Sequence, residues 1–312
     1  MTTSSAPPLF TTTGSPLNTP LDRSYQTSKI TPSPSTPKDE QPDYLIVDSD
    51  QLYYVLTPST PPPRAQVLLV GPFASERSHA YRLWARWARY LAAQGFDVLR
   101  FDFRGVGEST GAFENHSFTS WEADIHECVS FLRARSTLPL FLHGVGMGAL
   151  LSSRLFNQGL GEALLLWSPP VSARAMLYDT LRMRMATDFA LHRNAPRRTR
   201  EDYIAELESG QLVEVEGFLW SERLWRESEN YPLTLPPAVG DTSSSERPWS
   251  VIELDRRASD LMPVSAKMAG VPTKKTRPGT APPSLNSSLG AFFEPSCAWL
   301  HETATKRVAV RP

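Results

Sequence analysis

Strand-like apolar runs alternate with helical stretches over residues 66–167, and this alternation constrains the fold more than any other feature. The helical stretches carry apolar residues at a spacing of three and four, whereas the strand-like runs are short and almost wholly apolar. The expected strands are 66–70, 96–101, 138–143 and 163–167, and the expected helices between them are 80–94, 120–135 and 148–158. Such alternation is typical of right-handed crossovers, and it predicts a mostly parallel central sheet with helices on both faces.

The flanking segments suggest a division of the chain into four parts. In residues 1–42, 24 of the 42 positions are Pro, Thr or Ser, a composition that predicts a disordered leader. Residues 43–170 form the first part of the core, beginning with a hairpin over 44–56. Residues 171–235 read as a helical cap, with helices at 173–190, 200–209 and 221–229 and a strand at 213–218. Residues 236–312 complete the core with a strand at 249–254, a disordered loop near 271–290 and a last helix at 295–306.

Charge and composition exclude several classes of protein. The 32 basic and 33 acidic side chains leave a formal charge of −1, which argues against a nucleic-acid-binding protein. Two cysteines without a CxxC or Cys/His cluster argue against a structural metal site or a disulfide scaffold, and no motif indicates a cofactor. No apolar run approaches the ~20 residues that a membrane helix needs, and the first residues do not read as a signal peptide. We therefore expect a cytoplasmic protein without a membrane span.

The segment 142–150 contains the most informative motif. It follows an apolar strand and opens a helix. The spacing of its glycines 144, 146 and 148 is that of the small-x-nucleophile-x-small pattern, which forms the nucleophile elbow of α/β hydrolases. Gly144 and Gly148 stand at the flanking positions, where strand and helix backbones come too close for a side chain. The nucleophile position is Gly146, which has no atom that attacks an acyl carbon. The sequence thus predicts an elbow without its nucleophile.

Further motifs extend the resemblance. They are 71–77 (Gly-Pro-Phe-Ala-Ser-Glu-Arg), 101–109 with the pattern D-x-R-G-x-G-x-S, 165–170 and 214–218. With them, residues 45 to about 235 resemble serine-aminopeptidase-like α/β hydrolases, and are similar to the hydrolases of bacterial exosortase and exopolysaccharide loci. The resemblance implies an α/β-hydrolase fold with a helical cap. It also implies a serine at position 146 and an oxyanion hole formed by Met147 together with Phe73 or Ala74.

The acid and the base of such a family follow the nucleophile in chain order. Asp255 and Asp260 come after the late strand, where the acid is expected, and His301 is the only histidine beyond them. His301 lies within the last helical pattern, whereas the base of the family normally precedes that helix. Asp102 is expected to brace its loop through backbone hydrogen bonds.

The cap is rich in arginine. Between Arg174 and Arg200 there are seven arginines against Asp179 and Asp188, an excess that fits either an anionic ligand or a solvated face.

Two functions from different classes remain. In the first, the chain is a serine-hydrolase homologue that Gly146 impairs, and it keeps its pocket for a small acyl, ester or glycan-linked ligand or contacts a protein partner in an exopolysaccharide or exosortase system. In the second, it still hydrolyses an ester, thioester or amide through another group or an activated water. No metal is expected in either case.

Overall fold

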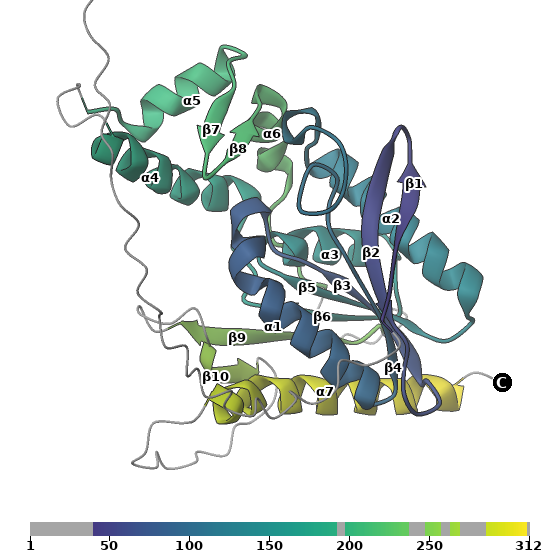
Figure 1. The fold of residues 1–312 in the computed structure, drawn as a ribbon. Coiled ribbons are helices and arrows are strands. Elements are labelled where there is room, and N and C mark those ends of the chain that lie inside the picture. Colours follow the sequence, from purple (N-terminus) through teal and green to yellow (C-terminus); the bar gives the residue numbers. More distant parts are fainter. Residues whose placement is uncertain (1–39, 192–196, 237–246, 257–262, 269–284, 311–312) are drawn as a thin grey trace, which may run out of the picture. The chain divides into compact units, whose positions relative to one another are not determined.

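The computed structural model describes residues 40–191, 197–236, 247–256, 263–268 and 285–310, all of them in the unit Asp39–Pro312. Eight strands form one sheet in the order β1-β2-β4-β3-β5-β6-β9-β10 (Figure 1). The strands are β1 (Gln41–Val47), β2 (Asp50–Thr57), β3 (Ala65–Val70), β4 (Phe96–Phe101), β5 (Leu140–Val145), β6 (Ala163–Trp167), β9 (Trp249–Arg256) and β10 (Pro263–Met268). The neighbours from β4 to β9 in this order pair in parallel, while β1, β2 and β10 join antiparallel at the two edges. The predicted fold class is confirmed.

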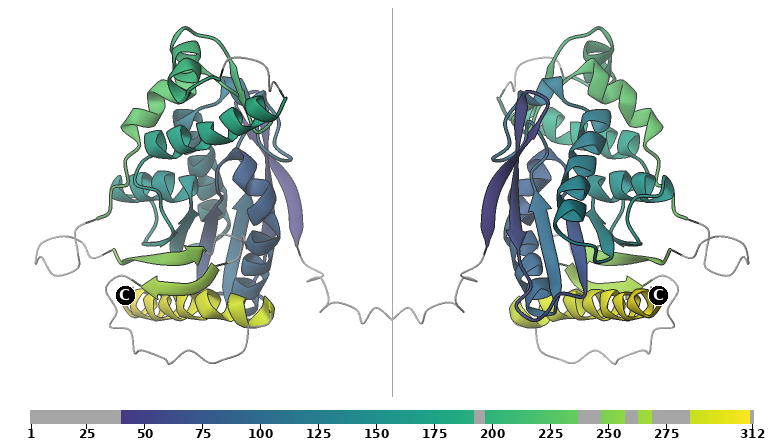
Figure 2. Two further views of the ribbon diagram at one scale, coloured as in Figure 1. Left: turned by 90° about the vertical axis from the view of Figure 1, so that its left-hand side faces the viewer. Right: turned by 90° about the vertical axis from the view of Figure 1, so that its right-hand side faces the viewer.

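Helices cover both faces of the sheet, as the strand alternation of side chains requires (Figure 2). On one face Leu68, Leu142 and Leu166 pack against α2 (Phe118–Arg135) and α3 (Met147–Asn157). On the other face Leu69 and Leu165 pack against α1 (Ala74–Ala93) and α7 (Leu285–Val310). Each parallel strand is therefore buried on both sides, which explains why the sequence of these strands is almost entirely apolar.

The cap elements follow β6 in the chain. They are α4 (Ala173–Leu191), α5 (Arg200–Glu208), β7 (Val213–Val215), β8 (Phe218–Trp220), α6 (Glu222–Glu227) and the short helix η2 (Ser228–Asn230). The expected strand at 213–218 is a hairpin: Glu216 and Gly217 form its turn with φ of 51° and 87°, the positive values that a tight two-residue turn requires. The ring of Trp220 in β8 lies 6.0 Å from that of Phe73, which follows β3, so the cap contacts the carboxyl-terminal edge of the sheet.

Three expectations about the end of the chain need correction. Helix α7 begins at Leu285 rather than near 295, and Pro295 lies inside it, although proline is more often found in the first turn. The loop expected near 271–290 is therefore wrong for residues 285–290, while residues 269–284 lie outside the described residues. Of the leader expected at 1–42, residues 1–39 also lie outside the described residues. Residues 41 and 42 begin β1. Strand β10, a short antiparallel edge strand, was not expected.

No helix in the described ranges has both the length and the apolar character that a membrane crossing demands.

Candidate active site

The backbone at Gly146 forms a sharp turn between β5 and α3. Its φ of 56° and ψ of −127° are disfavoured for residues with a side chain, and α3 begins at the next residue. A Cβ on Gly144 would lie 2.6 Å from the Cα of Ala149, and one on Gly148 would lie 2.3 Å from the carbonyl oxygens of Val70 and Gly71. The strand and the helix thus cross in contact, and the turn presents position 146 toward the carboxyl edge of the sheet.

The side-chain position at Gly146 faces an acidic group. A Cβ built there would lie 3.1 Å from Oε2 of Glu76 and 3.6 Å from Cβ of Pro72. Glu76 belongs to the first turn of α1, and Gly146 is the N-cap of α3. The carboxylate therefore lies near the amino-terminal ends of two helices, where the peptide dipoles favour a negative charge.

The candidate oxyanion donors come from the same two helix ends. Met147 is the first residue of α3, Phe73 is the N-cap of α1, and Ala74 opens α1 with a φ of 32°. N–H groups in the first turn of a helix have no partner within the helix, so Ala74 and Met147 supply the type of donor that stabilises an oxyanion.

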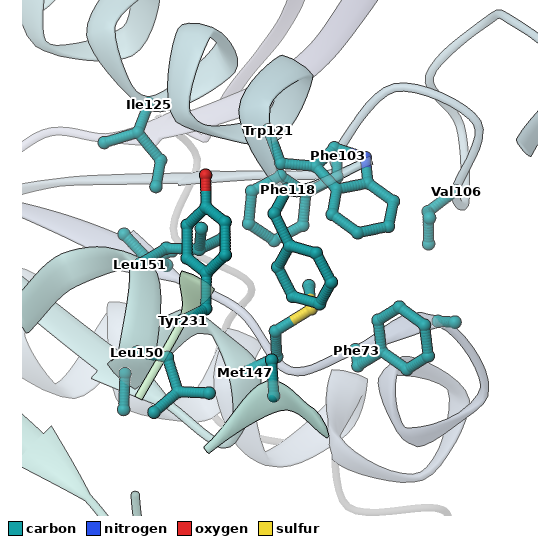
Figure 3. Close-up of a cluster of buried hydrophobic side chains, with 14 of the residues drawn as sticks. Phe73, Phe103, Val106, Phe118, Trp121, Ile125, Met147, Leu150, Leu151 and Tyr231 are labelled. Carbon is teal, nitrogen blue, oxygen red and sulfur yellow. The ribbon is translucent and has the colours of Figure 1, made fainter. Parts of the chain in front are cut away.

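The side chains of Met147 and Phe73 pack in an aromatic cluster (Figure 3), and Phe73 also lines a neighbouring cleft. Both are buried, and the Phe73 ring lies 5.8 Å from that of Trp121. Phe118 stacks on Tyr231 with a centroid distance of 4.7 Å. Residues of the core and Tyr231 of the cap thus close one side of the elbow with apolar groups.

A cleft of about 730 Å³ lies between α1 and α4, next to the Glu76 carboxylate that faces the Gly146 position. Glu76 and His79 line it from α1, and Met176 and Asp179 line it from α4. At its margin Ser75 Oγ donates a hydrogen bond of 2.5 Å to Oε2 of Glu216 in the β7–β8 turn. This bond links the 71–77 segment to the cap.

The loop after β4 is braced by charged side chains. Asp102 accepts two hydrogen bonds from Arg77 and a third, of 3.1 Å, from the main-chain N–H of Glu108. A Cβ on Gly107 would lie 2.3 Å from Oδ2 of Asp102, which explains the glycine at this position. Arg104 is buried and donates from Nε to Asp124 over 2.6 Å.

The comparisons with known proteins agree with this architecture. Residues 61–206 match the family described as serine aminopeptidase, S33. This segment is similar to that family, and the sheet and its covering helices have the α/β-hydrolase fold. No curated protein matches it.

Solved structures of α/β hydrolases are similar to part of this chain. A lidless α/β serine hydrolase from Xanthomonas campestris is 26% identical with a TM-score of 0.39, over 45% of this chain and 65% of that one. Est1E of Butyrivibrio proteoclasticus, solved with ferulic acid, is 18% identical with a TM-score of 0.43, over 61% and 72% of the two chains. A serine hydrolase homologue from Coxiella burnetii is 20% identical with a TM-score of 0.36, over 45% and 66%. The match thus spans about two thirds of the Xanthomonas and Coxiella proteins.

His301, the residue considered as the base, lies at the amino-terminal end of β4, at the edge of the sheet opposite the elbow. Its ring packs on Phe96, the first residue of β4, with centroids 4.9 Å apart. By the strand register Phe96 is level with the start of β5, so the elbow is at least five residues, or roughly 17 Å, farther along the strands. Helix α7 crosses the α1 side of the sheet, with Ser296 bonded to Trp167 at the end of β6 and His301 at the start of β4, so no side-chain rotation brings His301 to Gly146.

The expected acids are placed only in part. The backbone of Asp255 in β9 lies three residues beyond Ile252, which pairs with Trp167, so Asp255 stands at the carboxyl edge of the sheet. Asp260 lies outside the described residues. In the part of the chain that the structure describes, His79 is the only histidine lining the cleft beside the elbow. The sequence itself shows that His79 follows Glu76 by three residues, and this spacing was a signal that both residues share a site.

The side chains of Cys128, His143 and Ser153 are buried. Burial raises the pKa of the Cys128 thiol well above its usual range, and burial lowers the pKa of His143 to about 3. His143 contacts the carbonyl oxygen of Leu165 and three tryptophan rings on the α1 side of the sheet. Ser153 Oγ donates to Leu150 within α3 and is fully buried.

Most arginines of the cap have partners within the cap. Arg174 pairs with Glu229 and lies on the ring of Trp225, and Arg184 and Arg198 pair with acidic side chains of the cap. These ion pairs neutralise three of the arginines between Arg174 and Arg200. The described residues also contain no group of three or more His, Cys, Asp or Glu arranged for a metal ion.

Proposed function

We propose that this α/β hydrolase is catalytically impaired and uses the cleft between α1 and α4 to bind a small ligand. The observation that carries the proposal is the elbow itself: its backbone is that of a nucleophile turn, but Gly146 offers no attacking atom. Cys128 and Ser153 are buried away from the cleft, and Ser75 Oγ, which lines it, donates a hydrogen bond to Glu216. His301 lies at the other edge of the sheet, which supports the loss of the base as well.

The cleft supports a ligand-binding role. Its volume of about 730 Å³ suits a small organic molecule, and both apolar and polar side chains line it. The ligand class that the family resemblance favours is an acyl or ester compound or a glycan-linked form of one. The 71–77 and 214–218 motifs carry the resemblance to hydrolases of exosortase and exopolysaccharide loci, and they meet at the Ser75–Glu216 bond beside this cleft. We therefore place the chain as an accessory protein of such a system.

A second candidate is hydrolysis by an activated water. Glu76 and His79 lie three residues apart on α1, and both line the cleft, so either is placed to take a proton from a water bound there. This function needs no side chain at position 146.

Turnover of a short-chain nitrophenyl ester separates the two candidates. The wild type, Gly146→Ser, Glu76→Gln and His79→Gln are compared, with Gly159→Ser as the control because Gly159 also has a positive φ but faces open space. The impaired hydrolase predicts that none exceeds the buffer rate, since a serine alone lacks a base. Wild-type turnover that falls at least tenfold in Glu76→Gln or His79→Gln supports the activated water and contradicts the first proposal.

A further inference from the structure

A second, much smaller cavity lies beneath α1, away from the cleft. It has a volume of about 20 Å³, enough for one water-sized group, and its lining includes Tyr53, Gly71, Tyr81, Trp84 and the charged side chains of Arg77, Arg100 and Asp102. These residues come from β2, the end of β3, α1 and the end of β4. Proposals about the elbow do not involve it.

Buried donors without acceptors surround this cavity. Nε of Arg100 and Nε1 of Trp84 are inaccessible to solvent and have no hydrogen-bond partner. The indole nitrogen of Trp84 lies 3.7 Å from the Cβ position of Gly71, so it faces the cavity wall that Gly71 forms. Buried N–H groups without a partner cost free energy, and two of them at one cavity indicate a missing acceptor.

The charges around the cavity do not balance. The Arg77 guanidinium is bound by both oxygens of Asp102. Both oxygens of Glu40 are bound by Arg89, at 3.1 and 2.9 Å, and Arg100 approaches Glu40 only to 3.8 Å. Three arginines thus share two carboxylates, and the third arginine, Arg100, has a side chain that is only 9% exposed.

Tyr81 does not remove this imbalance. Its hydroxyl accepts a hydrogen bond of 3.2 Å from Nη1 of Arg100, and its ring contacts the guanidinium groups of Arg77 and Arg100. A hydroxyl satisfies one donor but supplies no negative charge. The carboxylate of Glu108 belongs to an exposed residue and does not line the cavity.

We propose that this cavity binds a monovalent inorganic anion of halide size, held by the guanidinium of Arg100 and the indole N–H of Trp84. An anion supplies both the acceptor and the charge, whereas a water molecule supplies only the acceptor. The volume excludes carboxylate-bearing metabolites and phosphate, and it suits chloride or bromide. The bound ion stabilises the packing of α1 on the ends of β3 and β4.

Thermal unfolding in sodium chloride and in sodium gluconate at equal ionic strength tests the proposal, because gluconate is too large for the cavity. A ligand that binds only the folded state raises the melting temperature, here by roughly 3 °C in chloride over gluconate. Arg100→Gln is expected to abolish the difference, and Trp84→Phe to reduce it. The matched control is Arg133→Gln, which removes a surface arginine paired with Glu162 and should keep the full difference.

A direct measurement completes the test. Bromide soaked into crystals of the wild type is expected to give an anomalous peak beside Arg100 Nε and a weaker one in Trp84→Phe, a variant that stays informative if Arg100→Gln does not fold. Equal melting temperatures in the two salts, a difference that persists in Arg100→Gln, or a cavity that holds only water in the bromide crystals would overturn the proposal.

Discussion

Oε2 of Glu76 lies 3.1 Å from the position that a Cβ would take on Gly146. In an elbow with a serine, this is the space through which the hydroxyl reaches its substrate. Here a carboxylate from α1 stands beside it, near the helix N-termini that would otherwise stabilise a developing oxyanion. The glycine at position 146 and the neighbouring carboxylate both support the proposed impairment of acyl transfer.

A side chain at position 146 is expected to destabilise the fold. Since Gly146 has a φ of 56°, Gly146→Ala and Gly146→Ser should each lower the free energy of unfolding by about 1–3 kcal/mol. Chemical denaturation of the wild type and the two variants measures this change. A serine variant more stable than the wild type would contradict the strain that we assign to this turn.

The crossing of β3 and α3 should tolerate no side chain at Gly148. Because a Cβ there meets the carbonyl oxygens of Val70 and Gly71 at 2.3 Å, Gly148→Ala is expected to cost about 3 kcal/mol or more. Gly71→Ala is the matched control, since its Cβ has its nearest contact at 3.7 Å, an ordinary van der Waals distance. Equal melting temperatures for the two variants would refute the steric argument.

The sequence predicted the central strands well because each is apolar and flanked by turn residues. It failed at α7, where Pro295 suggested a helix start but residues 285–294 extend the helix toward its amino terminus. It also missed β10, whose pairing with β9 depends on a contact between strands rather than on a local pattern. Local periodicity therefore sufficed for the buried elements and not for the last part of the chain.

Lowering the pH should destabilise the protein through His143. Burial lowers its pKa to about 3 in the folded state, against about 6.5 when unfolded, so the unfolded state binds more protons between these values. The unfolding free energy contributed by His143 therefore falls by about 3 kcal/mol from about pH 7 to about pH 4.

The variant His143→Gln isolates this contribution, because Asp124 acts in the opposite direction. Burial raises the pKa of Asp124 to about 6, so the folded state gains stability as Asp124 takes up a proton below that pH. Urea denaturation over this pH range should show a smaller loss of stability in His143→Gln than in the wild type. Parallel pH profiles for the two proteins would contradict the burial of a neutral imidazole.

The ion pair between Arg104 and Asp124 should matter far more than surface pairs. Both side chains are buried, at 4% and 0% exposure, so Arg104→Met leaves a buried carboxylate unpaired and should cost about 3–5 kcal/mol near neutral pH. Arg133→Met, which removes the exposed pair with Glu162, should cost less than about 1 kcal/mol. Comparable losses in the two variants, measured by denaturation, would argue against this difference.

The candidate site was only partly predictable. Gly146 was found because the elbow is a local motif with fixed spacing, whereas Glu76 lies 70 positions earlier in the chain and reaches the elbow only through the packing of α1 beside β3 and β5. His301 was proposed from chain order alone, and chain order does not reveal that this part of α7 packs on Phe96 at the start of β4. The contacts that decide the chemistry are long-range, and no local pattern encodes them.

Intact-mass analysis after incubation with a fluorophosphonate probe tests the loss of the nucleophile most directly. Such probes add covalently to an activated serine at an elbow, and the native chain has only Gly146 at that place. We predict that the wild-type protein keeps its unmodified mass at every probe concentration. A stoichiometric adduct on the wild-type protein, mapped to one residue by peptide sequencing, would contradict the account.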